Sequence, residues 1–139
     1  MKNFLLLIIC LNIFCSAFSQ TTTENKPEKF DKVFTKVEQP AKFPGGEKGF
    51  ENYLLRNLNV APLAGFLNSP QTAKVKFIVS ETGLVSNVSV VNADELHPEV
   101  VKEAIRFIKR GPKWQPAKQN GISVNYQVIQ PVVFSAINS

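Results

Sequence analysis

The sequence has very few of the residues that form disulfides, metal sites or catalytic groups. It contains two cysteines, Cys10 and Cys15, and one histidine, His97. Both cysteines lie in the first nineteen residues, so the rest of the chain cannot build a disulfide framework or a cysteine zinc site. The only aspartates are Asp31 and Asp94, which leaves no plausible catalytic triad. We therefore expect a protein that is not an enzyme and has no catalytic residues, metal or cofactor.

The chain also lacks long runs of charge of one sign. Its formal net charge is +5, and one of the basic residues, Lys2, lies in the N-terminal segment. Lysines are interspersed with acidic residues and no block of five or six like charges occurs, which is typical of a solvated surface. No sugar-binding cluster of aromatic residues and carboxylates is evident. We expect neither a nucleic acid partner nor a small-molecule substrate.

The first nineteen residues have the pattern of a secretory signal peptide. Lys2 precedes an apolar run from Phe4 to Phe18, and the small residues Ala17 and Ser19 predict cleavage after Ser19. As a helix, a run of about fifteen residues spans roughly 22 Å, which is shorter than the roughly 30 Å hydrocarbon core of a bilayer. We expect residues 1–19 to be removed and the protein to be periplasmic. The alternative is that this segment stays as an inner-membrane anchor.

Residues 20–42 are rich in Thr, Glu and Lys and read as a flexible tether. Within it, Phe34 and Val37 could form a short strand or clip that leads towards Phe43. Residues 43–139 are predicted to form one domain, because about 120 residues suffice for a single hydrophobic core.

The domain begins with an amphipathic pattern. Gly45 and Gly46 fit the turn that opens a helix over residues 47–58. Its apolar stripe has helical spacing and consists of Phe50, Tyr53, Leu54 and Leu58. A second helix is predicted from Pro98 to residue 110, with His97 as a surface or capping residue at its start. The apolar stripe of this helix is predicted to be Val101, Ala104, Ile105 and Ile108.

Three strands are predicted from alternating apolar residues. The first covers residues 73–80, and a turn with Gly83 at positive φ connects it to a second strand over residues 84–92. Apolar residues lie on both faces of that second strand, so either it is covered on both sides or a bulge shifts its register. The third strand follows the Asn120-Gly121 turn, with inward-facing residues Val124, Tyr126, Val128, Val132 and Phe134.

These elements predict an α+β fold with two helices packed on a three-stranded antiparallel sheet of order 2-1-3. The third strand is then an edge strand. Pro131 agrees with that position, because a proline in a central strand would lose a hydrogen bond of the ladder. The alternative is that Pro131 simply ends the regular strand.

Several motifs in this order resemble the TonB C-terminal domain. They are FPGG before a helix, the hairpin KVKFIVSETGLVSNVSVV, the segment AIRFIKRGPKWQPAKQNG and the ending YQVIQPVVF. The resemblance covers residues 43–134 and is closest to the compact version found in Bacteroidetes-type energy transducers.

The resemblance implies a periplasmic domain that binds an extended segment, the TonB box, of an outer-membrane TonB-dependent transporter. That segment would add as a strand to the edge formed by the third strand. Carried onto this sequence, the partner-binding residues would be Asn125, Tyr126, Gln127, Val128, Ile129 and Gln130. Trp114, in the P-x-W-x-P turn, is expected to cover the core rather than to contact the partner.

The sequence departs from a complete transducer in two ways. No retained membrane helix with a long proline-rich spacer is evident. Residues 60–73 also lack the Tyr-Pro, and the glycine just before the first strand, that relatives usually carry. An alternative function is therefore a free periplasmic adaptor of the same fold, with no energy-transducing role. Such an adaptor would bind another peptide or the cell wall, or would form a homodimer through the open edge.

Overall fold

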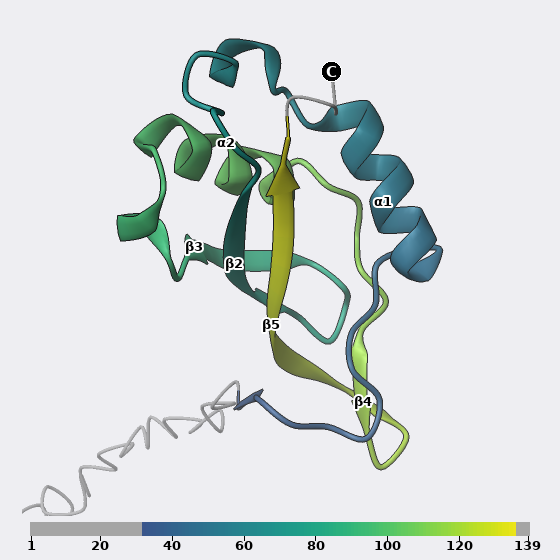
Figure 1. Ribbon diagram of the computed structural model, residues 1–139. Helices are drawn as coiled ribbons and strands as arrows, with labels where there is room; N and C mark the ends of the chain where they lie inside the picture. The colour runs from purple at the N-terminus through teal and green to yellow at the C-terminus, as the bar shows by residue number, and fades with distance from the viewer. Residues whose placement is uncertain (1–31, 136–139) are drawn as a thin grey trace, which may run out of the picture.

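A sheet of five strands carries the fold, and two α-helices lie against it (Figure 1). The computed structural model describes residues 32–135. The strands are β1 (Val33–Phe34), β2 (Gln71–Val79), β3 (Val85–Val90), β4 (Ala117–Gln119) and β5 (Ile122–Phe134). The helices are α1 (Gly46–Asn57) and α2 (Pro98–Lys109), with short 3₁₀ turns at Ala61–Leu63 and Ala93–Glu95. The predicted leader, residues 1–19, lies outside the described residues.

The centre of the sheet has the predicted order, but its edge does not. Strands β3, β2 and β5 are antiparallel neighbours, which is the expected 2-1-3 arrangement. The sheet is nevertheless larger and mixed, because β1 pairs with β5 in parallel and β4 pairs with β5 as a hairpin. The prediction of a purely antiparallel, three-stranded sheet was therefore incomplete, and the third strand is not a bare edge.

The second predicted strand, β3, contains the bulge that was one of the two explanations for apolar residues on both of its faces. The pairing of Lys76 with Ser89 gives way to that of Ile78 with Ser86, so β3 has an extra residue at this point. Asn87 lies there with φ of 53°, a left-handed conformation that asparagine adopts more easily than most residues. The bulge explains why apolar side chains fall on both faces of β3.

Helix α2 packs on β2 and β3 through a face slightly different from the predicted one. Its buried residues are Val100, Ala104, Phe107 and Ile108. Val101 and Ile105, both in the predicted stripe, are only half-buried. Six apolar side chains surround much of this helix, and the pattern could not decide which of them face the sheet. Residues at i, i+4, i+7 and i+8 do so.

A cluster of aromatic rings joins α1 to the sheet. The ring of Trp114 lies 5.1 Å from that of Phe77 on β2 and 5.4 Å from that of Phe43. Phe43 in turn lies 5.4 Å from Phe50 on α1. Trp114 is 6 % exposed, so the expectation that it covers the core is confirmed.

The FPGG turn sits tightly on the start of α1. Gly45 and Gly46 have φ of 80° and 68°, as the predicted turn requires. Gly49, one turn into the helix, lies so close to the backbone that a Cβ there would be 2.0 Å from the Pro44 carbonyl oxygen. This contact fixes Phe43 against the helix.

The other end of α1 is braced by an ion pair on α2. The Glu103 carboxylate and the Arg106 guanidinium form an ion pair. The hydrogen bond between these two side chains raises the pKa of Arg106 above its ordinary value. Glu103 also accepts a hydrogen bond from the Asn59 amide at 2.8 Å, and Arg106 donates one to the Asn57 carbonyl at 3.1 Å. At the start of α2, His97 is the N-cap and its Nδ1 accepts from the Glu99 amide. The capping interpretation of His97 is thus confirmed.

Candidate functional site: the outer edge of β5

The predicted binding residues, 125–130, lie in the first half of β5. On one side β5 pairs along the whole of β2, from Tyr126 opposite Val79 to Phe134 opposite Gln71. This is the inner side of β5. The opposite side, away from β2, is called the outer edge below.

Backbone groups of β5 alternate between these two sides. The Val91 amide donates to the Lys74 carbonyl at 2.9 Å, so the polar groups of Lys74 face β3. The backbone polar groups of the next residue, Val75, therefore face β5. Those of its register partner, Gln130, face β2 in return. It follows that Ile129 and Pro131, on either side of Gln130, direct their backbones to the outer edge.

This alternation explains how Pro131 can lie inside a long strand. Its register partner is Lys74, and the missing N–H lies on the outer edge, where it takes nothing from the ladder with β2. β5 continues through Pro131 to Phe134. The alternative that Pro131 ends the regular strand is wrong. Because the backbone of Pro131 faces the outer edge, its presence in β5 agrees with the edge interpretation.

The outer edge is partly occupied by the chain itself. Val33 and Phe34 of β1 pair in parallel with Asn125 and Tyr126. Two of the six predicted binding residues thus already have a strand beside them on the outer edge. In a parallel pair of this register, the outward-facing N–H of Gln127 points to the Phe34 carbonyl. Within residues 32–135, no strand pairs with the outer edge of β5 from Val128 to Gln130.

Side chains of the predicted residues lie on both faces of the sheet. Val128 packs against the core, whereas Ile129 is 54 % exposed on the face away from the helices. Asn125 Oδ1 accepts a hydrogen bond from the Glu81 amide at 3.0 Å. Gln130 is half-buried on the helix side, and its Nε2 donates to the Pro131 carbonyl. The backbone of Val128–Gln130 is therefore the part most available to another strand.

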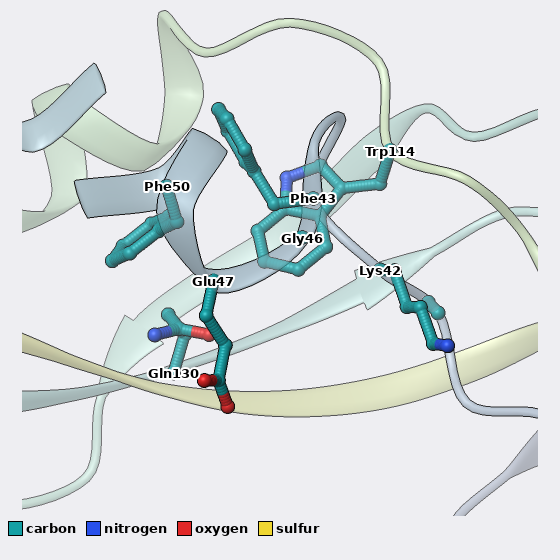
Figure 2. Close-up of a pocket in the computed structure, with 8 residues that line it drawn as sticks. Lys42, Phe43, Gly46, Glu47, Phe50, Trp114 and Gln130 are labelled. Carbon is teal, nitrogen blue, oxygen red and sulfur yellow. The ribbon is translucent and has the colours of Figure 1, made fainter. Parts of the chain in front are cut away.

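A cleft of about 600 Å³ lies beside this stretch, between β5 and the start of α1. Figure 2 shows Gln130 on β5 and Glu47 on α1 next to each other at its mouth, with Lys42 on the other side. The lining residues are Ala41, Lys42, Phe43, Gly46, Glu47, Phe50, Trp114 and Gln130. The cleft thus has an aromatic floor and a rim with one positive and one negative side chain.

The chemistry of this region suits recognition of a backbone rather than reaction. Among residues 32–135, no three His, Cys, Asp or Glu side chains come together in a way that could hold a metal ion. Neither helix in that part of the chain has the length and hydropathy of a membrane span. The edge offers backbone donors and acceptors, and the cleft offers a partly apolar wall beside them.

Comparison with known proteins adds the family. The model of the family described as "Gram-negative bacterial TonB protein C-terminal" matches residues 71–136, which include β2, β3, α2, β4 and β5. This region belongs to the TonB C-terminal domain family. No curated protein and no solved structure gives a match.

Membership in the TonB family has consequences for the class of function. TonB C-terminal domains belong to a non-enzymatic, transport-related family that interacts with outer-membrane TonB-dependent transporters. In Gram-negative bacteria these domains are periplasmic or membrane-anchored. The match implies a TonB-like role in TonB-dependent transport for residues 71–136.

Sequence reasoning missed two parts of the site. One is the pairing of β1 with β5. The short strand expected at Phe34 is confirmed, whereas Val37 lies outside it. The other is the cleft, whose walls come from Lys42 to Phe50, Trp114 and Gln130. The FPGG motif was the available signal, since its close packing on Gly49 places Phe43 at the cleft floor.

Proposed function

We propose that this domain binds an extended segment of an outer-membrane TonB-dependent transporter by adding it as a strand to the outer edge of β5. The observation that carries the proposal is the unpaired stretch Val128–Gln130 beside a cleft. Backbone hydrogen bonds at Ile129 would supply much of the affinity. Partner side chains on the helix side would meet the cleft, because neighbouring strands direct paired residues to the same face.

The alternation of the β5 backbone makes the proposal testable residue by residue. A synthetic peptide from the plug terminus of a transporter is titrated into the isotope-labelled chain, and the backbone amides are followed by NMR. We expect the outward-facing amide of Ile129 to shift more than those of Val128 and Gln130, which face β2. Amides of α2 from Glu99 to Arg106 should hardly move. Shifts confined to other elements, or none at about 1 mM peptide, would contradict the proposal.

A matched pair of variants separates backbone pairing from side-chain contact. Ile129→Pro removes one outward-facing N–H and should weaken binding of the same peptide at least tenfold, because the partner strand loses a ladder hydrogen bond and meets the proline ring. Ile129→Val keeps the N–H and a β-branched side chain, so its affinity should stay close to that of the wild type. Equal loss in both variants would point to side-chain recognition instead.

The same NMR experiment addresses self-association through this edge. If the edge pairs with a second copy of the chain, the amide of Ile129 should shift on dilution without peptide. Concentration-independent spectra would leave the transporter segment as the occupant of the edge.

A further inference from the structure

The outer edge of β5 has a paired segment followed directly by an unpaired one. Asn125 and Tyr126 are paired with β1, and Val128–Gln130 lie beyond it without a strand beside them. Because β1 runs parallel to β5, the chain after Phe34 heads towards the unpaired stretch and then bends away at Thr35 and Lys36. The segment leaves the edge where the unpaired stretch begins.

β1 is weakly held in this position. It is two residues long, and neither Val33 nor Phe34 belongs to the hydrophobic core or to the side chains packed against it. Val33 is 37 % exposed. The ring of Phe34 has the Lys32 ammonium 4.7 Å from its centre, a contact that stays largely solvated.

The segment that follows β1 is anchored firmly. Gln39 and Lys118 exchange two backbone hydrogen bonds, at 3.1 and 2.8 Å, and Lys42 and Gln115 exchange another two. The Glu38 carboxylate accepts from the Asn120 amide at 3.2 Å. β1 is therefore a short arm attached a few residues from a fixed point. Its effective concentration at the edge stays high even when it detaches.

We propose that β1 is an internal competitor of the partner strand at the outer edge of β5. With β1 in place, a partner can pair with the outer edge at Val128–Gln130 but not at Asn125 and Tyr126, and at Pro131 it finds no N–H. When β1 leaves, the edge lengthens to include Asn125 and Tyr126. The inference rests on the proposed function, and it adds that the chain regulates access to its own binding edge.

The first test opens the edge. Phe34→Pro removes a backbone donor and the aromatic ring of β1, and Lys36→Pro places the same substitution in the exposed bend that pairs with no strand. Binding of the transporter plug peptide to the full chain is measured by calorimetry. We expect Phe34→Pro to tighten the Kd by roughly 3- to 10-fold, because apparent affinity scales with the fraction of binding-competent chains. Lys36→Pro should leave it unchanged.

The second test closes the edge. In a background with Cys10→Ser and Cys15→Ser, the register neighbours Phe34 and Tyr126 are both replaced by cysteine and oxidised. The crosslink should weaken peptide binding at least tenfold, and reduction should restore it. If neither the Phe34→Pro substitution nor the crosslink changes the Kd of the peptide, β1 does not compete with the partner strand.

A peptide with the sequence of residues 30–37 separates this inference from the proposed function. It should bind the Phe34→Pro chain, with NMR shifts at Asn125 and Tyr126, more tightly than it binds the wild type. If it does so while no transporter peptide binds any variant, the competition stands and the proposed partner is wrong. If transporter peptides bind wild type and Phe34→Pro equally, the partner stands and the competition is wrong.

Discussion

The two sides of β5 differ in almost every respect although they belong to one strand. On the inner side, β5 is antiparallel to β2 along the whole of that strand. On the outer edge it is parallel to β1 over two residues only. The inner side is scaffold, since β2 carries the fully buried residues Val75, Phe77 and Val79. The comparison teaches that one strand can serve stability and recognition at once, because successive residues direct their backbone groups to opposite sides.

The largest expected effect lies on the scaffold side, at Trp114. Its ring is 6 % exposed and stands edge-on to Phe77 of β2 and to Phe43. Trp114→Ala should lower the free energy of unfolding by roughly 3–5 kcal/mol, because it leaves a cavity between α1 and the sheet. Thermal or urea denaturation measures it. An unchanged melting temperature would mean that the indole is not part of the core.

A second prediction places the same substitution on both sides of β5. Val128→Pro removes an N–H that faces Phe77 on β2, so it should cost about 3 kcal/mol or more through the lost ladder bond and the unpaired carbonyl. Ile129→Pro removes an outward N–H from an exposed residue and should cost about 1 kcal/mol or less. Urea denaturation of the two variants gives both values. Similar losses would break the distinction between the two sides.

Two glycines with similar backbone conformations provide a further test of packing on the scaffold side. Gly83 and Gly121 have φ of 86° and 75°, so alanine at either should cost about 1–2 kcal/mol for the left-handed conformation. At Gly83 a Cβ would also lie 2.2 Å from the Trp114 carbonyl oxygen, whereas at Gly121 nothing lies within 4 Å. Gly83→Ala should therefore be the more destabilising by about 1–3 kcal/mol. Equal melting temperatures for the two variants would show that the hairpin turn can move away from Trp114.

Much of the scaffold side could be predicted from the sequence because its residues repeat. Alternation at Val75, Phe77 and Val79 indicated β2, and the mixed faces around Val88 allowed the bulge that Asn87 makes. The rotation of α2 could not be predicted, since Val100 and Val101 are equally apolar and only contact with β2 and β3 selects between them.

The recognition side could be predicted only in part. Pro131 indicated an edge strand, and the alternation of β5 now explains why a proline is tolerated there. A short strand at Phe34 was expected, but its pairing with β5 and the cleft could not be predicted, because they depend on segments far apart in the sequence. Phe34 becomes the register partner of Tyr126, and Glu47 and Gln130 come to line the same cleft, only after the sheet has formed. Neither leaves a periodic signal in the sequence.

The smallest expected effect concerns the rim of the cleft, where recognition should respond and stability should not. Glu47 is exposed at the start of α1 and lines the cleft, whereas Glu51, one turn later, is exposed and does not. Glu47→Gln should weaken a peptide with a basic side chain facing the cleft by roughly twofold to fivefold, because one carboxylate is lost beside Gln130.

Glu51→Gln serves as the matched control, since it removes the same charge from the same helix and should leave that Kd unchanged. Melting temperatures should be the same for both variants and the wild type, because each side chain is exposed and makes no contact on which the core depends. Calorimetric titrations at low and moderate salt measure the two affinities. If Glu51→Gln weakens binding as much as Glu47→Gln, the effect comes from the overall charge of α1. A difference confined to Glu47 would place the partner's side chain in the cleft, on the helix side of the outer edge.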